Sequence, residues 1–195
     1  IEVLASQGIK GTTHRAIASQ AKLQLSLTTY YFKDIQELVH QAFILNSSRI
    51  IAKASAAWLP VFELLSSYTK TQLKKTATRA ELASKLTAAA TKYLVDNITD
   101  NATELAVKQL LFTELQSTPQ LRELADSHRK ALIEPFVHLC QHFNQETAAI
   151  DADIMLTLFT QTEYRNISVA ANELDTNSSE QTIKRLVHWI VQVEQ

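Results

Sequence analysis

Apolar residues recur at helical spacing along most of the chain. Near the C-terminus, Ile183, Leu186, Val187, Ile190 and Val191 follow the i, i+3, i+4, i+7, i+8 order of an amphipathic helix. The same spacing predicts helices over about residues 1–7, 34–51, 78–97, 103–116, 118–144 and 151–172, and a broken helical pattern over residues 53–77. No stretch alternates with the two-residue period of a strand. With two further short helices between residues 12 and 34, the pattern predicts an all-α protein of about nine helices.

Local signals predict several helix boundaries. A capping box pairs an N-cap side chain with a Glu or Gln three residues later, and each side chain bonds a free backbone N–H of the other. This pattern occurs at Asp34 with Glu37, at Thr78 with Glu81, and at Ser178 with Gln181. Gly8 predicts the end of the first helix, and Pro60 predicts a break in the helix over residues 53–77.

Composition narrows the class of protein. Only two glycines and three prolines occur among 195 residues, and Gly8 and Gly11 alone cannot form a phosphate-binding glycine loop. The single cysteine, Cys140, cannot form an internal disulfide, which favours a reducing cytoplasm. No apolar run approaches the ~20 residues of a membrane span. The chain begins inside a helix without a cap, so we expect further residues before Ile1.

The stretch from Thr12 to Asp34 predicts two short helices joined by a tight turn. Thr12 or Thr13 can cap the first helix, and the second would run from Gln24 or Leu25 to Phe32. Three apolar side chains spaced by four residues are predicted to pack onto the first helix: Leu23, Leu27 and Tyr31. The outer side would carry short hydrogen-bonding groups and one cation, which suits a groove of DNA: Gln24, Ser26, Thr29, Tyr30 and Lys33.

This stretch resembles the helix-turn-helix of the TetR family of bacterial transcription regulators. The resemblance spans about residues 1–45 and rests on Thr12, Thr13, Ile17, Ala18, Ala21, Leu23, Ser26, Tyr30, Phe32, Asp34, Glu37 and Leu38. Two glycines common in the family are replaced, by Lys22 in the turn and by Ser26 in the second helix. The resemblance implies a three-helix DNA-binding domain over residues 1–45 and a larger helical domain for ligand binding and dimerisation over residues 46–195.

The resemblance also implies roles in DNA binding. We expect Gln24, Ser26 and Thr29 to reach base edges in the major groove. The residues expected on phosphates are Thr13, His14, Tyr30 and Lys33, with core packing as the alternative for Tyr30. Lys22 is expected either in a left-handed conformation or in an ordinary turn that brings its ammonium to a phosphate. Residues 1–53 carry a net charge of +3, from six basic and three acidic residues, which supports local DNA contact.

The expected function is that of a homodimeric cytoplasmic repressor that binds a double-stranded operator and is released by a small hydrophobic effector. The predicted dimer contacts are Ile154, Leu158, Ile183, Val187, Ile190 and Val191. The effector pocket is expected between the helices over 78–97, 103–116 and 118–144, with Tyr93, Gln109, Phe112, His128 and Phe136. The alternative for Gln109 and His128 is bonding to neighbouring helices without a cavity. The alternative function is a helical protein–protein adaptor that does not bind specific DNA.

Other chemistry is weakly indicated. His138, Cys140 and His142 resemble a metal cluster in sequence, but on a helix Cys140 lies far around from the two histidines, and two histidines alone make a weak zinc site. Glu37 and His40 match the E-x-x-H motif of di-iron bundles, but the motif has no second copy, so capping is favoured. We therefore predict no metal, no cofactor and no enzyme activity.

Overall fold

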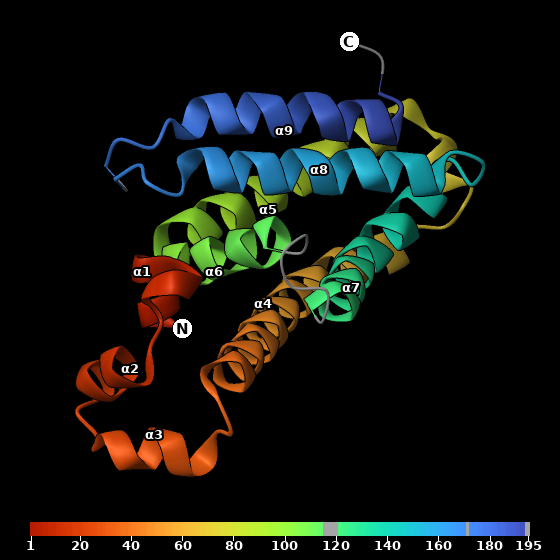
Figure 1. The fold of residues 1–195 in the computed structure, drawn as a ribbon. Coiled ribbons are helices and arrows are strands. Elements are labelled where there is room, and N and C mark those ends of the chain that lie inside the picture. The colour runs from red at the N-terminus through yellow and green to blue at the C-terminus, as the bar shows by residue number, and fades with distance from the viewer. Residues whose placement is uncertain (115–120, 171, 194–195) are drawn as a thin grey trace. The chain divides into compact units, whose positions relative to one another are not determined.

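The computed structural model of the protein describes residues 1–114, 121–170 and 172–193. Every regular element within these residues is helical, which confirms the all-α prediction (Figure 1). The helices are α1 Glu2–Gly11, α2 His14–Ala21, α3 Leu25–Tyr31, α4 Ile35–Ser66, α5 Thr76–Asp100, α6 Ala102–Thr113, α7 Arg122–Gln141, α8 Ala148–Asn166 and α9 Thr176–Val191, with a short 3₁₀ helix, η1, at Gln72–Lys74. The predicted junction between the helices over 103–116 and 118–144 lies largely outside the described residues.

The chain packs as two compact units. The first contains Ile1–Ile51 and Ala102–His128, and the second contains Ala52–Asn101 and Arg129–Gln195. Helices α4 and α7 each contribute to both units. This division differs from the predicted boundary after residue 45, because α6 packs against α1 within the first unit. The extent of a separate DNA-binding domain stays a prediction.

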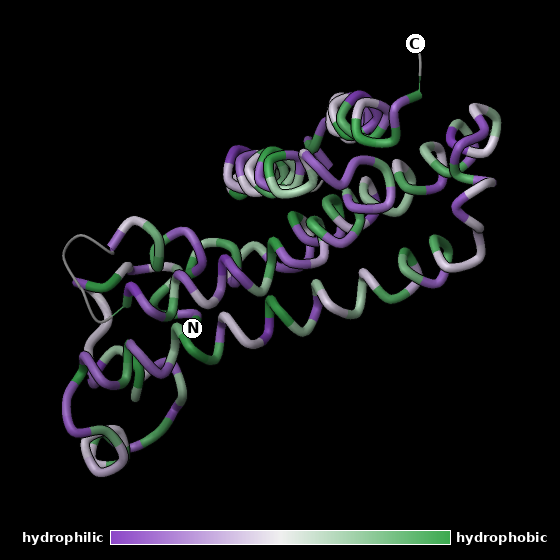
Figure 2. Tube along the Cα trace, turned by 90° about the vertical axis from the view of Figure 1, so that its right-hand side faces the viewer, coloured by the Kyte–Doolittle hydropathy of each residue, from purple (hydrophilic) through white to green (hydrophobic). Residues whose placement is uncertain are grey.

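Each unit has its own apolar core. In the first unit, Leu4 of α1 and Phe43 of α4 are buried together with Val107 and Leu111 of α6. In the second unit, α5 packs chiefly against α9 and also contacts α8. Hydrophobic and hydrophilic residues are interspersed along the helices (Figure 2), as expected for helices that bury one face.

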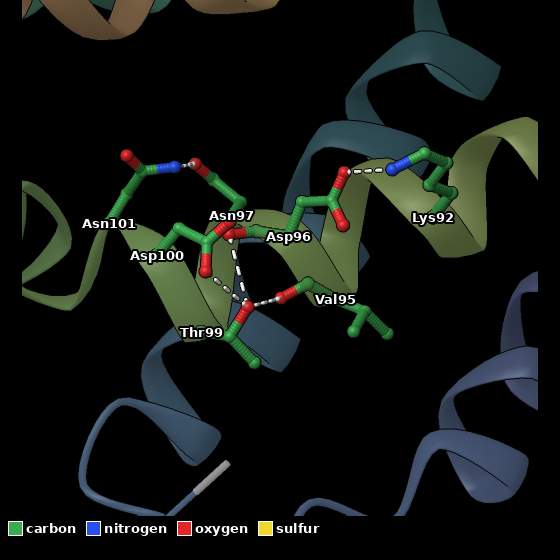
Figure 3. A network of polar contacts seen from close by, with 7 residues as sticks. All are labelled: Lys92, Val95, Asp96, Asn97, Thr99, Asp100 and Asn101. Atoms are coloured by element: carbon green, nitrogen blue, oxygen red, sulfur yellow. Dashed lines mark hydrogen bonds and ion pairs between the residues drawn. The ribbon is translucent and has the colours of Figure 1, made fainter.

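Polar side chains connect the end of α5 to its neighbours within the second unit. The buried Asn97 amide donates to a carboxylate oxygen of Glu163 on α8, at 2.6 Å, and accepts a hydrogen bond from Asn101 at 3.1 Å. Asn101 in turn accepts a hydrogen bond from Lys53 of α4. On the outer side of the same helix end, the Thr99 hydroxyl lies close to the Val95 carbonyl and the Asp100 carboxylate (Figure 3). These contacts connect α4, α5 and α8 at one point, and they give the buried Asn97 and Glu163 side chains hydrogen-bond partners.

Several predicted helix boundaries are wrong. The segments predicted over residues 34–51 and 53–77 form one helix, α4, which ends at Ser66. Helix α4 continues through Pro60 instead of breaking there. Helix α5 begins at Thr76 rather than at Thr78, and α9 is capped by Asp175, whose side chain accepts from the Ser178 N–H, rather than by Ser178. Gly8 interrupts α1 with a positive φ of 66°, but the helix resumes and ends at Gly11.

Candidate nucleic-acid interface

Helix α2 starts at a capped end, as predicted. The Thr13 hydroxyl oxygen accepts a hydrogen bond from the Ala16 N–H at 3.1 Å, which satisfies one of the free donors at the helix start. Thr12 plays a different part, because its buried hydroxyl donates to the Gly8 carbonyl at 2.7 Å. A side-chain hydrogen bond of 2.7 Å from Gln20 to Glu2 also connects α2 to α1. The C-terminal end of α2 is therefore connected to the start of α1.

Lys22, in the turn between α2 and α3, has a left-handed backbone conformation, which is one of the two conformations expected for it. Lys22 has φ 54° and ψ 40°, and its N–H bonds back to α2. A non-glycine residue in this conformation carries a steric cost of roughly 1–2 kcal/mol. Leu23 follows, and its N–H bonds the Ala18 carbonyl at 2.9 Å. The turn thus redirects the chain sharply into α3.

The outer side of α3 is polar and exposed. Gln24 forms the N-cap position, and Ser26, Thr29 and Tyr30 project from the helix with exposed side chains. The Tyr30 side chain is 81% exposed, so core packing of this residue is excluded. Its ring meets the Tyr31 ring edge-on at a centroid distance of 5.1 Å. These side chains offer hydroxyl and amide groups that could reach base edges and phosphates.

A second capped helix start follows α3 directly. The Asp34 carboxylate accepts from the Glu37 N–H at 2.8 Å, as the capping box predicts. The Glu37 carboxylate reaches back to the Lys33 N–H at 2.7 Å, one residue before the N–H that the motif predicts. This arrangement fixes the backbone of Lys33 and leaves its ammonium exposed. His14, at the start of α2, is half-buried.

The inner side of α3 is only partly covered, contrary to the prediction. Leu23, Leu27 and Tyr31 are 54%, 39% and 71% exposed, and Thr28 is the buried residue of this helix. The three side chains line a hollow of about 360 Å³ whose opposite wall includes Leu38 and Leu45 of α4. Helix α3 contacts α2, and Ile17 of α2 also lines this hollow, so the three side chains are covered only on one side.

The residues predicted for an effector pocket fall in both units. Gln109 and Phe112 are half-buried and His128 is buried in the first unit, whereas Tyr93 and Phe136 belong to the second. His128 Nδ1 lies 2.7 Å from the buried Ser47 hydroxyl, and the His128 ring lies beside Phe112. Burial, together with a smaller contribution from the charge of Lys108, lowers the pKa of His128 to about 4. The pocket itself stays a prediction.

Sequence reasoning missed two buried polar residues of α4, one of which contacts His128. Asn46 and Ser47 of α4 are buried, and the Asn46 amide donates to the Glu104 carbonyl at 3.0 Å. Their positions follow the spacing of the buried residues Phe43 and Ile50 on the same helix. The signal that could have identified Asn46 and Ser47 is their polarity at positions where the helical spacing predicts buried apolar residues.

Four of the six predicted dimer contacts are buried within the protomer. Ile183, Val187, Ile190 and Val191 belong to the apolar core of the second unit and leave almost no surface for a partner. Their regular spacing identified the inward face of α9. On α8, Ile154 is 42% exposed and Leu158 is half-buried, so these two stay available.

Comparison with known proteins identifies the fold. No protein-family model matches the chain, and no curated protein matches it. A proposed TetR-family transcriptional regulator from Mesorhizobium loti MAFF303099 superposes with a TM-score of 0.70 at 14% identity, over 98% of this chain and 90% of the other. A proposed transcriptional regulator from Streptomyces coelicolor A3(2) is 24% identical, with a TM-score of 0.57 over 95% of this chain and 91% of the other. The chain therefore has the fold of TetR-like transcriptional regulators.

Among the described residues, no helix combines the length and apolar character that would span a bilayer. The same residues contain no group of three or more histidine, cysteine or acidic side chains placed to hold a metal ion. Cys140 is buried next to Met155 at 3.7 Å, and burial raises the pKa of its thiol to about 12.

Proposed function

We propose that this protein is a TetR-family regulator that binds a double-stranded DNA operator through α3. The observation that carries the proposal is the exposed polar side of α3, in a helix-turn-helix whose first helix is capped by Thr13 and which is followed by the capped start of α4 at Asp34. Gln24, Ser26 and Thr29 would read base edges. Thr13, His14, Tyr30 and Lys33 would contact phosphates. The fold shared with two proposed transcriptional regulators supports this function.

The proposal is tested with DNA that flanks the protein's own gene, in a mobility-shift titration. The triple variant Ser26→Ala, Thr29→Ala, Lys33→Ala should lose specific binding, because it removes two groups expected at bases and one at a phosphate. A matched control removes the same three residue types from an exposed segment of the second unit: Ser66→Ala, Thr71→Ala, Lys70→Ala. Equal affinity of both triple variants for the operator would disprove the assignment.

We propose further that the regulator acts as a homodimer. Helix-turn-helix dimers place two recognition helices about 34–36 Å apart to meet adjacent turns of DNA. Exposed apolar residues on α8 and α9 support a partner surface in the second unit. They are Ile150 and Ile154 on α8 and Trp189 on α9. Leu158, one turn after Ile154 on α8, is half-buried.

The third part of the proposal is release from the operator by a small hydrophobic effector. The effector must bind the DNA-incompetent conformation more tightly than the competent one, and a tenfold preference corresponds to ~1.4 kcal/mol. A screen of apolar compounds for a thermal shift, followed by operator titration with each compound that binds, tests this part. A compound that binds tightly without changing operator affinity contradicts the release mechanism, and the DNA-binding proposal is unaffected.

A further inference from the structure

Two exposed histidines lie together at the C-terminal end of α7. His138 is in the last turn of the helix, and His142 follows the last helical residue, Gln141. Their ring centroids are 5.4 Å apart, and both side chains are exposed. The sequence alone favoured two unrelated surface histidines, but the orientation of the rings adds information that spacing could not supply.

The tautomer of His142 follows from its hydrogen bond. Its Nδ1 lies 2.9 Å from the His138 backbone carbonyl oxygen. Because a carbonyl oxygen can only accept, Nδ1 must carry the hydrogen, and the lone pair of neutral His142 is on Nε2. Histidines that ligate metals commonly donate their second N–H to a carbonyl or carboxylate in this way, which fixes the ring for coordination.

The His138 ring is held by aromatic neighbours instead. It lies 4.7 Å from the Phe62 ring of α4, and Phe62 stacks on Trp58 at 5.4 Å. Among the described contacts, neither ring nitrogen of His138 has a hydrogen-bond partner. The ring is therefore positioned by packing while its nitrogens stay available.

The spacing of the rings fits a shared metal ion. With a metal–nitrogen distance of about 2.1 Å and a tetrahedral angle, two imidazole rings on one ion have centroids about 5 Å apart. The observed 5.4 Å is close to this value. Square-planar coordination would bring the centroids closer together, so the spacing favours a tetrahedral ion such as Zn²⁺.

The helix end and the residues nearest in sequence also favour a cation. The C-terminal end of a helix carries the negative end of its dipole. No lysine or arginine occurs between Ala131 and Ile150, and Glu134 and Glu146 are exposed on either side of the pair in sequence. Cys140, the third potential ligand in the sequence motif, is buried against Met155 and takes no part.

We propose that His138 and His142 form a two-histidine site for a divalent metal ion of the Zn²⁺ type. His142 coordinates through Nε2, and water completes the coordination shell. The site is distinct from the proposed DNA-binding and effector functions. Two ligands on one helix end bind more tightly than one, because the second bond forms at high effective concentration.

Calorimetric titration of the full chain with Zn²⁺ tests the proposal. We expect one ion per chain in the tightest class of sites. His138→Ala and His142→Ala should each weaken that binding by at least about tenfold, because each removes the chelate. His40→Ala, which removes a histidine from the first unit, is the matched control and should leave the affinity unchanged. Equal affinity in all three variants would overturn the site.

Nitrogen NMR of the histidine rings provides a second readout that does not depend on mutation. On addition of Zn²⁺, the Nε2 resonance of His142 should shift while Nδ1 stays protonated. A shift confined to other histidines, or metal bound at Nδ1 of His142, would contradict the proposed geometry. Unchanged thermal melting of both alanine variants would show that weaker binding reflects a lost ligand and not a lost fold.

Discussion

The Ser47 hydroxyl and His128 Nδ1 lie 2.7 Å apart inside the first unit, and this buried contact joins α4 to α7. Protonation of His128 would place a charge in an apolar environment near the charged Lys108. The pKa of His128 is accordingly lowered from 6.5 to about 4. The neutral imidazole is therefore the form that the folded protein requires.

Stability should fall as the pH decreases through this window. In the unfolded chain His128 takes up a proton near pH 6.5, but in the folded chain it does so only near pH 4. The stabilising contribution is present above pH 6.5 and is lost progressively between pH 6.5 and 4, by at most about 3 kcal/mol. His128→Asn should remove this part of the pH dependence in urea unfolding. His40→Asn is the control, and an equal flattening by both variants would contradict the assignment.

Glycine at position 22 should relieve backbone strain in the turn between α2 and α3. Its left-handed φ of 54° costs roughly 1–2 kcal/mol, and glycine avoids the cost but gains unfolded-state entropy. We expect Lys22→Gly to be more stable than Lys22→Ala by about 1 kcal/mol, measured by thermal unfolding. The alanine variant also loses the charge, so the comparison isolates the backbone. A glycine variant no more stable than the alanine variant would exclude strain at this turn.

Removal of the α2 cap should destabilise the helix-turn-helix. Thr13→Ala loses the hydrogen bond to the Ala16 N–H and should cost about 1 kcal/mol, whereas Thr13→Ser keeps the hydroxyl and should cost much less. Chemical denaturation of the three proteins measures both differences. Equal losses for alanine and serine would mean that the methyl group, and not the cap, carries the effect.

Substitution of an exposed and of a buried isoleucine should distinguish loss of the dimer from loss of the fold. Ile154→Asp changes a side chain that is 42% exposed on α8, so we expect a folded monomer in sedimentation. Ile183→Asp places a carboxylate in the core of the second unit, so we expect an unfolded or strongly destabilised protein. A dimer that persists in Ile154→Asp would exclude this face as the partner surface.

Sequence periodicity predicted the helices better than their ends. Pro60 does not break α4 because Pro60 and Ala56 are both exposed, so water can reach the carbonyl that loses its partner. At Thr78 the capping pattern is present, but the extended backbone that a cap requires occurs at Lys75 instead. A motif of side chains cannot show where the backbone leaves the helical conformation.

For the candidate site, the sequence predicted which residues of α3 are exposed and polar but not how its apolar side is covered. The outer residues of α3 could be identified because their polarity contrasts with the surrounding apolar stripe. The regular spacing of Leu23, Leu27 and Tyr31 could not show that the surface opposite them is left open. On α9, spacing identified an apolar face without showing whether Ile183 and Val187 meet the same protomer or another. Periodicity gives the direction of burial, whereas the covering surface depends on tertiary packing.

The sparse burial of α3 has a consequence for its dynamics. A seven-residue helix with Thr28 as its buried residue has little apolar contact to resist local opening. Its amide hydrogens should exchange with solvent long before those of α5 and α9, whose Leu94 and Ile183 lie in a dense core. An operator would then order α3 as it binds, and part of the contact free energy would offset that ordering. Affinity would depend on the intrinsic helicity of residues 25–31 as well as on the groups that touch DNA.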